Sequence, residues 1–209
     1  MAAGKGLLID LEGIDGSGKA VQSQRLKKWL ESQGYTVKLY SYPDIKSDYG
    51  KVLDKFLDGK VDLDLMTQVL TFAADISKDQ GKIRGEIDEG KVVVLDRYVP
   101  STVAYQVAHG LGMRETLDLL ERVRFQKPDL IALFDIEVKT AVERRKKKKG
   151  ERKNDRHDAN KMILTEVRKN YLRLYKRRWL SPNWVKVNGE RTIDQVNEEL
   201  KKRIKQLLE

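Results

Sequence analysis

The stretch LIDLEGIDGSGKAVQSQ, residues 8–24, constrains the fold of this chain more than any other. Its first part is short and apolar, which favours a buried parallel strand, and a helical pattern follows the glycines. Gly13, Gly18 and Lys19 fall where the phosphate-binding pattern G-x-x-x-x-G-K-[ST] places them. Glycines in such a turn let successive backbone N–H groups face a phosphate, and the helix dipole adds positive potential. The stretch therefore predicts a polyphosphate site beyond the end of a strand.

The last position of this pattern is broken. Ala20 stands where a Ser or Thr hydroxyl normally holds Mg²⁺. Mg²⁺ usually keeps several waters, so a water can occupy the coordination position that the hydroxyl would fill. We therefore expect an enzyme with a lowered rate rather than an inactive one. Ser17 and Ser23 carry hydroxyls nearby, but neither replaces the missing ligand by simple geometry. An ordinary glycine-rich turn is the competing interpretation, and the intact G-x-x-x-x-G-K favours phosphate binding.

Strand-like and helical runs alternate along the chain. Strands are predicted at residues 6–12, 36–43, 91–96, 128–136 and 184–189. Helical patterns cover residues 19–33, 48–90, 100–125, 138–148, 158–179 and 191–208, with a break at 58–64 where Gly59 is the predicted stop and Asp62 the predicted N-cap. This alternation predicts an α/β fold with a five-stranded, mostly parallel sheet and helices on both faces. In such sheets ligands bind beyond the carboxyl ends of the strands.

Composition excludes several kinds of site and indicates an anionic partner. The 209 residues fit one domain; the absence of cysteine excludes disulfides and thiolate metal sites, and two histidines argue against a zinc site. The formal charge is +10, and much of the excess lies in ERRKKKKGERKNDR, residues 143–156. No signal-peptide pattern and no run near the ~18 apolar residues of a membrane span occurs, so we expect a cytoplasmic protein without membrane contact.

A second cluster, LDRYVPSTVAYQ at residues 95–106, carries the most specific signal. Its Asp-Arg pair, taken alone, can equally be a buried structural ion pair. Together with other motifs it resembles the thymidylate kinases over nearly the whole chain. Those motifs are the glycine loop, YP at 42–43, FAAD at 72–75, GERKNDRHD at 150–158 and VRKNYL at 167–172. The resemblance implies a P-loop NTPase three-layer sandwich, one kinase domain over residues 1–209, and a basic lid at about 143–156.

The resemblance also implies the substrates. ATP would be the phosphoryl donor, dTMP the acceptor and dTDP the product, with Mg²⁺ as cofactor and a homodimer as the assembly. Asp96 would hold the metal, through water. The donor would contact the loop residues Gly13, Ile14, Asp15, Gly16, Ser17, Gly18, Lys19 and Ala20.

On the acceptor side, the resemblance implies that Asp15 accepts a hydrogen bond from the sugar 3′-hydroxyl and that Phe72 stacks on the thymine ring. Without the resemblance, Phe72 would more simply be a core side chain on an apolar helix face. The implied acceptor residues are Asp15, Pro43, Phe72, Arg97, Ser101, Tyr105 and Gln106.

Catalysis in this family depends on cations around the transferred phosphate. Arg97 matches the arginine between the acceptor and donor phosphates. The loop has no arginine, which resembles the family type whose further cation comes from the lid. The lysines at 146–149 are more simply a solvated helix face. The implied catalytic residues are Asp15, Lys19, Arg97, Arg145, Arg152 and Arg156.

Two departures weaken the acceptor side. Ile45 and Ile76 stand where the family usually has arginines that grip the acceptor, and each lost charge-assisted hydrogen bond costs about 1.5–3 kcal/mol. Lys46, Lys78 or Lys82 can compensate. The alternatives are therefore a kinase for another nucleoside monophosphate, or a nucleotide-binding homologue with little activity. We do not expect nucleic acid as a partner, because the basic segment lacks aromatics for base stacking.

Overall fold

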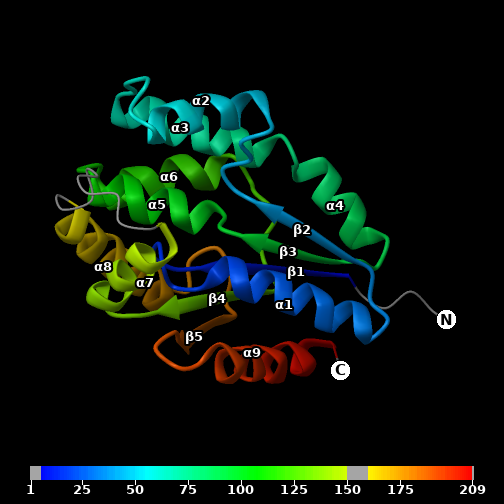
Figure 1. The fold of residues 1–209 in the computed structure, drawn as a ribbon. Helices are drawn as coiled ribbons and strands as arrows, with labels where there is room; N and C mark the ends of the chain where they lie inside the picture. The colour runs from blue at the N-terminus through cyan, green and yellow to red at the C-terminus, as the bar shows by residue number, and fades with distance from the viewer. Residues whose placement is uncertain (1–5, 150–159, 209) are drawn as a thin grey trace.

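The computed structural model describes residues 6–149 and 160–208. Within them the strands are β1 Leu7–Glu12, β2 Val37–Ser41, β3 Val92–Asp96, β4 Leu130–Asp135 and β5 Trp184–Asn188. The helices are α1 Lys19–Ser32, α2 Asp48–Leu57, α3 Leu65–Ser77, α4 Gln80–Asp88, α5 Val99–Ala108, α6 Met113–Arg122, α7 Val138–Lys149, α8 Asn160–Arg177 and α9 Ile193–Leu208. The five strands form one parallel sheet in the order β2-β3-β1-β4-β5 (Figure 1), which confirms the predicted fold class.

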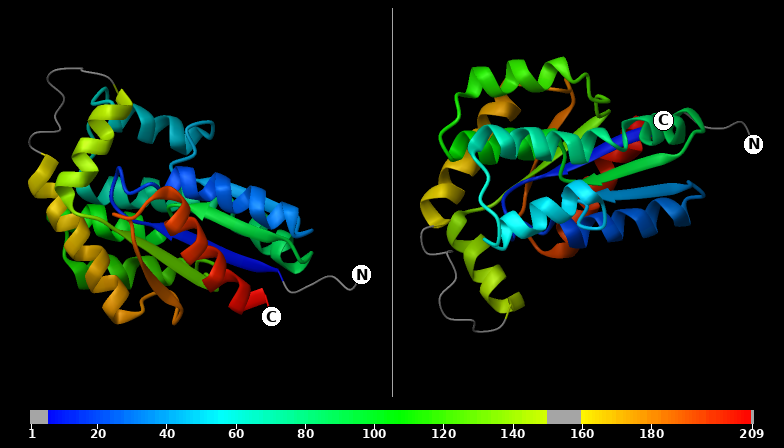
Figure 2. Two further views of the ribbon diagram at one scale, coloured as in Figure 1. Left: turned by 60° about the horizontal axis from the view of Figure 1, so that its bottom comes forward. Right: turned by 90° about the horizontal axis from the view of Figure 1, so that it is seen from above.

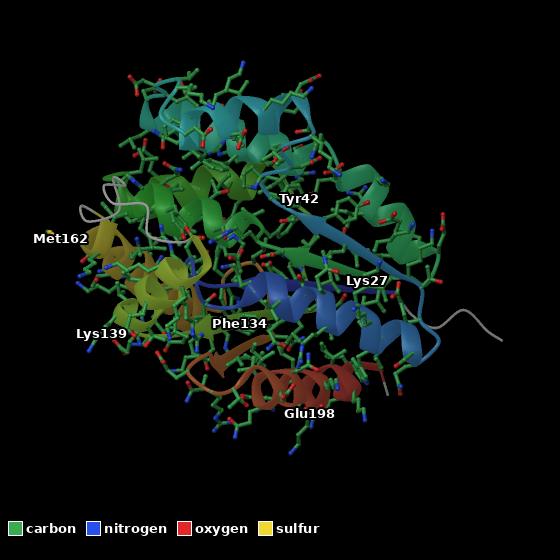
Figure 3. The ribbon with its side chains drawn as sticks, viewed as in Figure 1. Lys27, Tyr42, Phe134, Lys139, Met162 and Glu198 are labelled. Carbon is green, nitrogen blue, oxygen red and sulfur yellow. The ribbon has the colours of Figure 1, made fainter. Side chains whose placement is uncertain are left out.

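Helices cover both faces of this sheet and make three layers. α1 and α9 pack on one face through Leu26, Leu30, Leu200 and Ile204 (Figure 2). The other face carries α3, α4, α5, α6 and α8. Because both faces are covered, β1 is buried along its whole length, as its apolar sequence predicts. Figure 3 shows side chains on the outer surface, among them Glu198 of α9.

The breaks between helices differ in detail from the prediction. Gly59 ends α2 with a φ of 70°, as expected, but the predicted N-cap at Asp62 is wrong. Asp64 caps α3, and its carboxylate accepts hydrogen bonds of 3.0 Å from the amides of Met66 and Thr67. Asp64 directly precedes the apolar run of α3, so its carboxylate is the one in reach of the free amides.

The predicted break at 58–64 separates α2 from α3, but the divisions between α3 and α4 and between α5 and α6 were not predicted. The helical pattern over residues 48–90 contains α2, α3 and α4, and the pattern over 100–125 contains α5 and α6. Gly110, with a φ of 119°, turns the chain between the last two. No helix in the described parts of the chain is long and apolar enough to cross a membrane.

The strands end on the side of the molecule where α7 and α8 lie (Figure 1). β1 runs directly into the glycine loop, and β3 runs into Arg97 and Tyr98. β1 and β3 are adjacent in the sheet, with Leu11 opposite Asp96. The two motifs that the sequence singled out therefore lie next to each other.

Candidate functional site

The glycine loop adopts a backbone that only glycine takes up without strain. Gly13, Gly16 and Gly18 have φ values of 145°, 86° and 101°. A Cβ atom on Gly13 would lie 2.7 Å from the Phe134 carbonyl oxygen, and one on Gly16 would lie 2.5 Å from the Ala141 carbonyl oxygen. The loop therefore fits closely between β4 and α7, and its conformation requires residues without a Cβ atom at Gly13 and Gly16.

The side chain of Lys19 folds back and binds the glycine loop. Its ammonium group donates to the carbonyl oxygens of Gly13 and Ile14 at 2.8 and 3.1 Å, and to Ser17 Oγ at 3.4 Å. The residue is buried, and burial together with the charge of Arg97 lowers the pKa of Lys19 to about 8, although nearby carboxylates oppose the shift. A phosphate in the loop would give this ammonium group an anionic partner in place of the neutral oxygens to which it donates.

Arg97 is the centre of the site. It follows β3 with a φ of 73°, in the left-handed region that non-glycine residues rarely adopt. Its guanidinium forms an ion pair with Asp15 and donates to Ser101 Oγ at 3.0 Å and to the hydroxyls of Tyr105 and Tyr171 at 3.3 Å. It also lies over the Tyr105 ring, 5.2 Å from the ring centroid. Four side chains from the loop, α5 and α8 thus hold one guanidinium.

The structure separates the two residues of the Asp-Arg pair. Arg97 makes its ion pair with Asp15, whereas Asp96 lies on the sheet face that α1 covers, opposite Leu11. The side chain of Asp15 is 52% exposed. Burial of its carboxyl would raise the pKa of Asp15, but the charges of Arg97, Lys19 and Arg145 outweigh it and hold this pKa well below its ordinary value. Asp15 is therefore ionised at neutral pH.

The predicted acceptor residues fall into two groups. Ser101 and Tyr105 lie at Arg97, as described. Phe72 is half-buried on α3, which packs against α5, and neither core cluster of the described residues includes it. Pro43 is half-buried just after β2, and Gln106 is buried with its Oε1 unpaired within the described residues. None of the last three contacts Arg97 through a hydrogen bond in this structure.

The positions of the two missing arginines differ in environment. Ile45 is 56% exposed, whereas Ile76 is 2% exposed and part of the core. Two of the lysines that could compensate have partners: Lys82 lies over the Tyr40 ring, 5.6 Å from its centroid, and Lys78 is within 3.3 Å of three carboxylates. Those carboxylates belong to Asp44, Asp75 and Asp79.

The donor set fits a Mg²⁺ ion held mainly through water. No group of three or more His, Cys, Asp or Glu side chains in residues 6–149 and 160–208 could hold a metal by itself. Ala20 offers no oxygen, Ser23 Oγ donates to the Ala20 carbonyl at 3.1 Å, and Ser17 Oγ lies against Lys19. Asp96, at the end of β3 and opposite Leu11 of β1, is the carboxylate that the sequence analysis assigned to the metal. One carboxylate plus substrate phosphates and waters is a common Mg²⁺ arrangement, so the residues present fit the ion.

Of the predicted lid arginines, only Arg145 is in the described part of the chain. It belongs to α7, the helix that contacts Gly16, and its charge contributes to the low pKa of Asp15. Arg152 and Arg156 lie outside the described residues.

Sequence reasoning missed two residues of the site, Glu12 and Tyr171. Glu12 ends β1 and is fully buried, and Tyr171 reaches it from α8 with a hydroxyl-to-carboxylate distance of 2.9 Å. The only signal for Glu12 was an acidic residue at the end of an apolar strand. Nothing near Tyr171 in the sequence indicated its partner.

The comparisons with known proteins agree with this geometry. A family model described as thymidylate kinase matches residues 11–200. A probable thymidylate kinase of Thermococcus gammatolerans is 33% identical over 205 residues, covering 93% of this chain and 94% of the relative. A thymidylate kinase of Thermoanaerobacter sp. is 34% identical, covering 82% of this chain and 85% of the relative. One of Caenorhabditis elegans is 37% identical, covering 67% of each chain. This chain, with its glycine loop and its Arg97 at the end of β3, belongs to the thymidylate kinase family.

Proposed function

We propose that this protein transfers the γ-phosphoryl group of ATP to dTMP and releases dTDP and ADP. The observation that carries the proposal is the ion pair between Arg97 and Asp15, directly beside the Lys19 loop. This pair joins the residue expected between the two phosphates to the residue expected at the acceptor sugar. Donor and acceptor phosphates would thus meet at the carboxyl ends of β1 and β3.

The donor half consists of the loop and Lys19. Its backbone N–H groups and the N-terminus of α1 would bind the phosphates of ATP, and Lys19 would exchange its carbonyl partners for phosphate oxygens. Mg²⁺, when bound near Asp96, would neutralise charge on the phosphates. Ala20 contributes no oxygen, so Asp96 would hold the metal there, through water.

The acceptor half consists of Asp15, Phe72 and Arg97. Asp15 would accept from the sugar hydroxyl, Phe72 would stack on the base, and Arg97 would bind the acceptor phosphate. An oxygen of that phosphate attacks the γ-phosphorus directly, so no protein nucleophile is required. Tyr105 and Ser101 hold the guanidinium, which stays protonated because neighbouring acidic groups outweigh burial and raise the pKa of Arg97. Arg145, together with Arg152 and Arg156, would supply the remaining cations.

The assembly is also part of the proposal. The whole chain would act as one kinase domain in the cytoplasm, with residues 143–156 as its lid. A homodimer is supported by apolar side chains that α2 and α3 expose. They are Tyr49, Val52 and Leu57 on α2 and Leu70 on α3, between 41% and 60% exposed. Light scattering after gel filtration would give a dimer mass, and a monomer mass at micromolar concentration would contradict this assembly.

A coupled ADP-release assay with dTMP, dUMP, dCMP, dGMP and AMP tests the reaction. We expect the highest kcat/KM with dTMP. A higher kcat/KM with another monophosphate would make that compound the preferred substrate. The presence of Ile45 and Ile76 in place of the family's two arginines favours a broader choice of acceptor. ATP binding without turnover on all five would identify a nucleotide-binding homologue.

A variant pair tests the acceptor pocket. Phe72→Ala should raise the KM for dTMP by about tenfold, equal to about 1.4 kcal/mol, and leave the KM for ATP nearly unchanged. Ser77→Ala, an exposed change on the same helix, is the matched control. An unchanged KM for dTMP in Phe72→Ala would remove the stacking role.

A further inference from the structure

The fully buried carboxylate of Glu12 lies directly behind Arg97. Its Oε1 accepts from the backbone amides of Tyr98 and Ser101 at 2.9 and 3.1 Å. Its Oε2 accepts from Ser101 Oγ at 2.6 Å and from the Tyr171 hydroxyl at 2.9 Å. Glu12 therefore has four donors within hydrogen-bond distance, and their hydrogen bonds oppose the rise in pKa that burial of its carboxyl causes.

The same two hydroxyls contact the guanidinium of Arg97. Nη1 of Arg97 donates to Ser101 Oγ at 3.0 Å and to the Tyr171 hydroxyl at 3.3 Å. The two hydroxyl oxygens also lie 2.7 Å apart, and either can donate to the other, so two hydrogens serve three contacts. When the Tyr171 hydroxyl donates to Ser101, Ser101 donates to Glu12, and both oxygens can still accept from the arginine. The positive and negative groups are thus linked through two short relays, with no direct ion pair between Arg97 and Glu12.

Glu12 also holds the backbone that presents Arg97. A left-handed residue other than glycine persists only where the surrounding structure fixes it. The Arg97 amide donates to the Leu11 carbonyl at 3.1 Å, and the next amide, that of Tyr98, donates to Glu12. The turn is therefore fixed on both sides by the last two residues of β1.

We propose that Glu12 and Tyr171 are positioning residues for phosphoryl transfer, which orient the guanidinium of Arg97 without touching either substrate. The inference rests on the proposed function, because it gives Arg97 its place between the phosphates. Tyr171 matters because it belongs to α8, so the relay ties Arg97 to a helix distant in sequence. A guanidinium displaced by a fraction of an ångström stabilises the transferring phosphate less well.

Tyr171→Phe is the sharpest test, because it removes one hydroxyl and keeps the buried ring. We expect kcat to fall about tenfold, equal to about 1.4 kcal/mol, while the KM for ATP changes less than about twofold. Tyr175→Phe is the matched control on the same helix. Its ring packs on Trp184 and Arg178, away from Arg97, and kcat should stay at the wild-type value.

A double-mutant cycle separates positioning from general loosening of the structure. In an Arg97→Ala background, Tyr171→Phe should change kcat by less than about twofold, because the group that it orients is gone. Glu12→Gln should lower kcat in the wild-type background and likewise add little in Arg97→Ala. The proposal is overturned by a wild-type kcat in Tyr171→Phe, or by the same tenfold loss in both backgrounds.

A second measurement needs no turnover. Nitrogen-15 NMR of labelled arginine side chains reports rotation about the Cζ–Nε bond and exchange of the Nη hydrogens. We expect both rates at Arg97 to rise in Tyr171→Phe and to stay unchanged in Tyr175→Phe. Equal rates in all three proteins would overturn the positioning role. If the wild type phosphorylates none of the five monophosphates, the proposed function fails, and these rates still decide the positioning of Arg97.

Discussion

The state of Lys19 leads to a quantitative prediction about nucleotide binding. In the free protein the pKa of Lys19 is about 8, because the ammonium group is buried and faces the charge of Arg97. A polyphosphate in the loop would place negative charge within about 4 Å, an attraction of about 4 kcal/mol per charge at an effective dielectric constant of 20. That is about three pKa units, enough to return the pKa of Lys19 to above 10.

The uptake of protons follows from this shift. With a pKa of about 8, about one quarter of the Lys19 side chains are protonated at pH 8.5, and about nine tenths are protonated at pH 7. Binding should therefore take up about 0.75 proton per site at pH 8.5 and only about 0.1 proton at pH 7. The uptake increases with pH because a larger share of the lysine starts neutral.

Isothermal titration calorimetry measures this uptake directly. ATP is titrated into the protein at pH 8.5 in several buffers that differ in ionisation enthalpy, and the slope of the observed enthalpy gives the proton number. Lys19→Arg is the control, because a guanidinium is protonated at both pH values and should take up nothing. If wild type and Lys19→Arg show the same near-zero slope at pH 8.5, the proposed contact between Lys19 and the phosphates is refuted.

Three further changes have expected outcomes. Ala20→Thr should raise kcat by roughly tenfold at limiting Mg²⁺, about 1.4 kcal/mol, and an unchanged rate across a Mg²⁺ titration would contradict the account of the coordination position that Ala20 leaves to water. Gly16→Ala should lower the free energy of unfolding by about 1–3 kcal/mol in urea titrations, because its Cβ would meet the Ala141 carbonyl oxygen at 2.5 Å; wild-type stability would show that the loop can shift. Asp10 is fully buried, and burial holds its pKa well above the ordinary value. Its contribution to stability should therefore fall as the pH rises above about 4, and the urea midpoint of Asp10→Asn should exceed that of wild type at pH 8, with no difference near pH 4.

The sequence predicted the fold because its local signals agree with one another. Each predicted strand is a short apolar run between turn signals, and the structure places a strand within each of them. The choice of the N-cap failed because residues 58–64 contain several aspartates that all satisfy the local rule. Only the start of the packed face of α3 decides between them, and that depends on contacts with the rest of the protein.

The site was predictable where its residues form a contiguous motif, and it was missed where they do not. The loop and the Arg97 segment each carry a sequence pattern. Tyr171 lies within the VRKNYL motif, but that pattern does not name its partner, which is 159 positions away, and a tyrosine on a helix is as compatible with an ordinary core position. Asp75 is similar: it ends the FAAD motif, but its contacts with the Asp44 amide and the Ser47 hydroxyl, from which its buried carboxylate accepts, appear only in the folded chain.

Two acidic residues on β1 show what separates the site from the core. Asp10 and Glu12 lie on the same face of the strand and are both fully buried. Glu12 has four donors within hydrogen-bond distance, whereas both carboxyl oxygens of Asp10 are unpaired within the described residues. The difference comes from position, because Glu12 ends the strand, where the turn after β3 offers free amides, and Asp10 lies inside the sheet, where the backbone amides bond to neighbouring strands. The buried carboxylate of Glu12 can thus orient Arg97 at the end of the strand. The buried carboxyl group of Asp10, two residues earlier, has no such partner in the described parts of the chain and is expected to lower the free energy of unfolding.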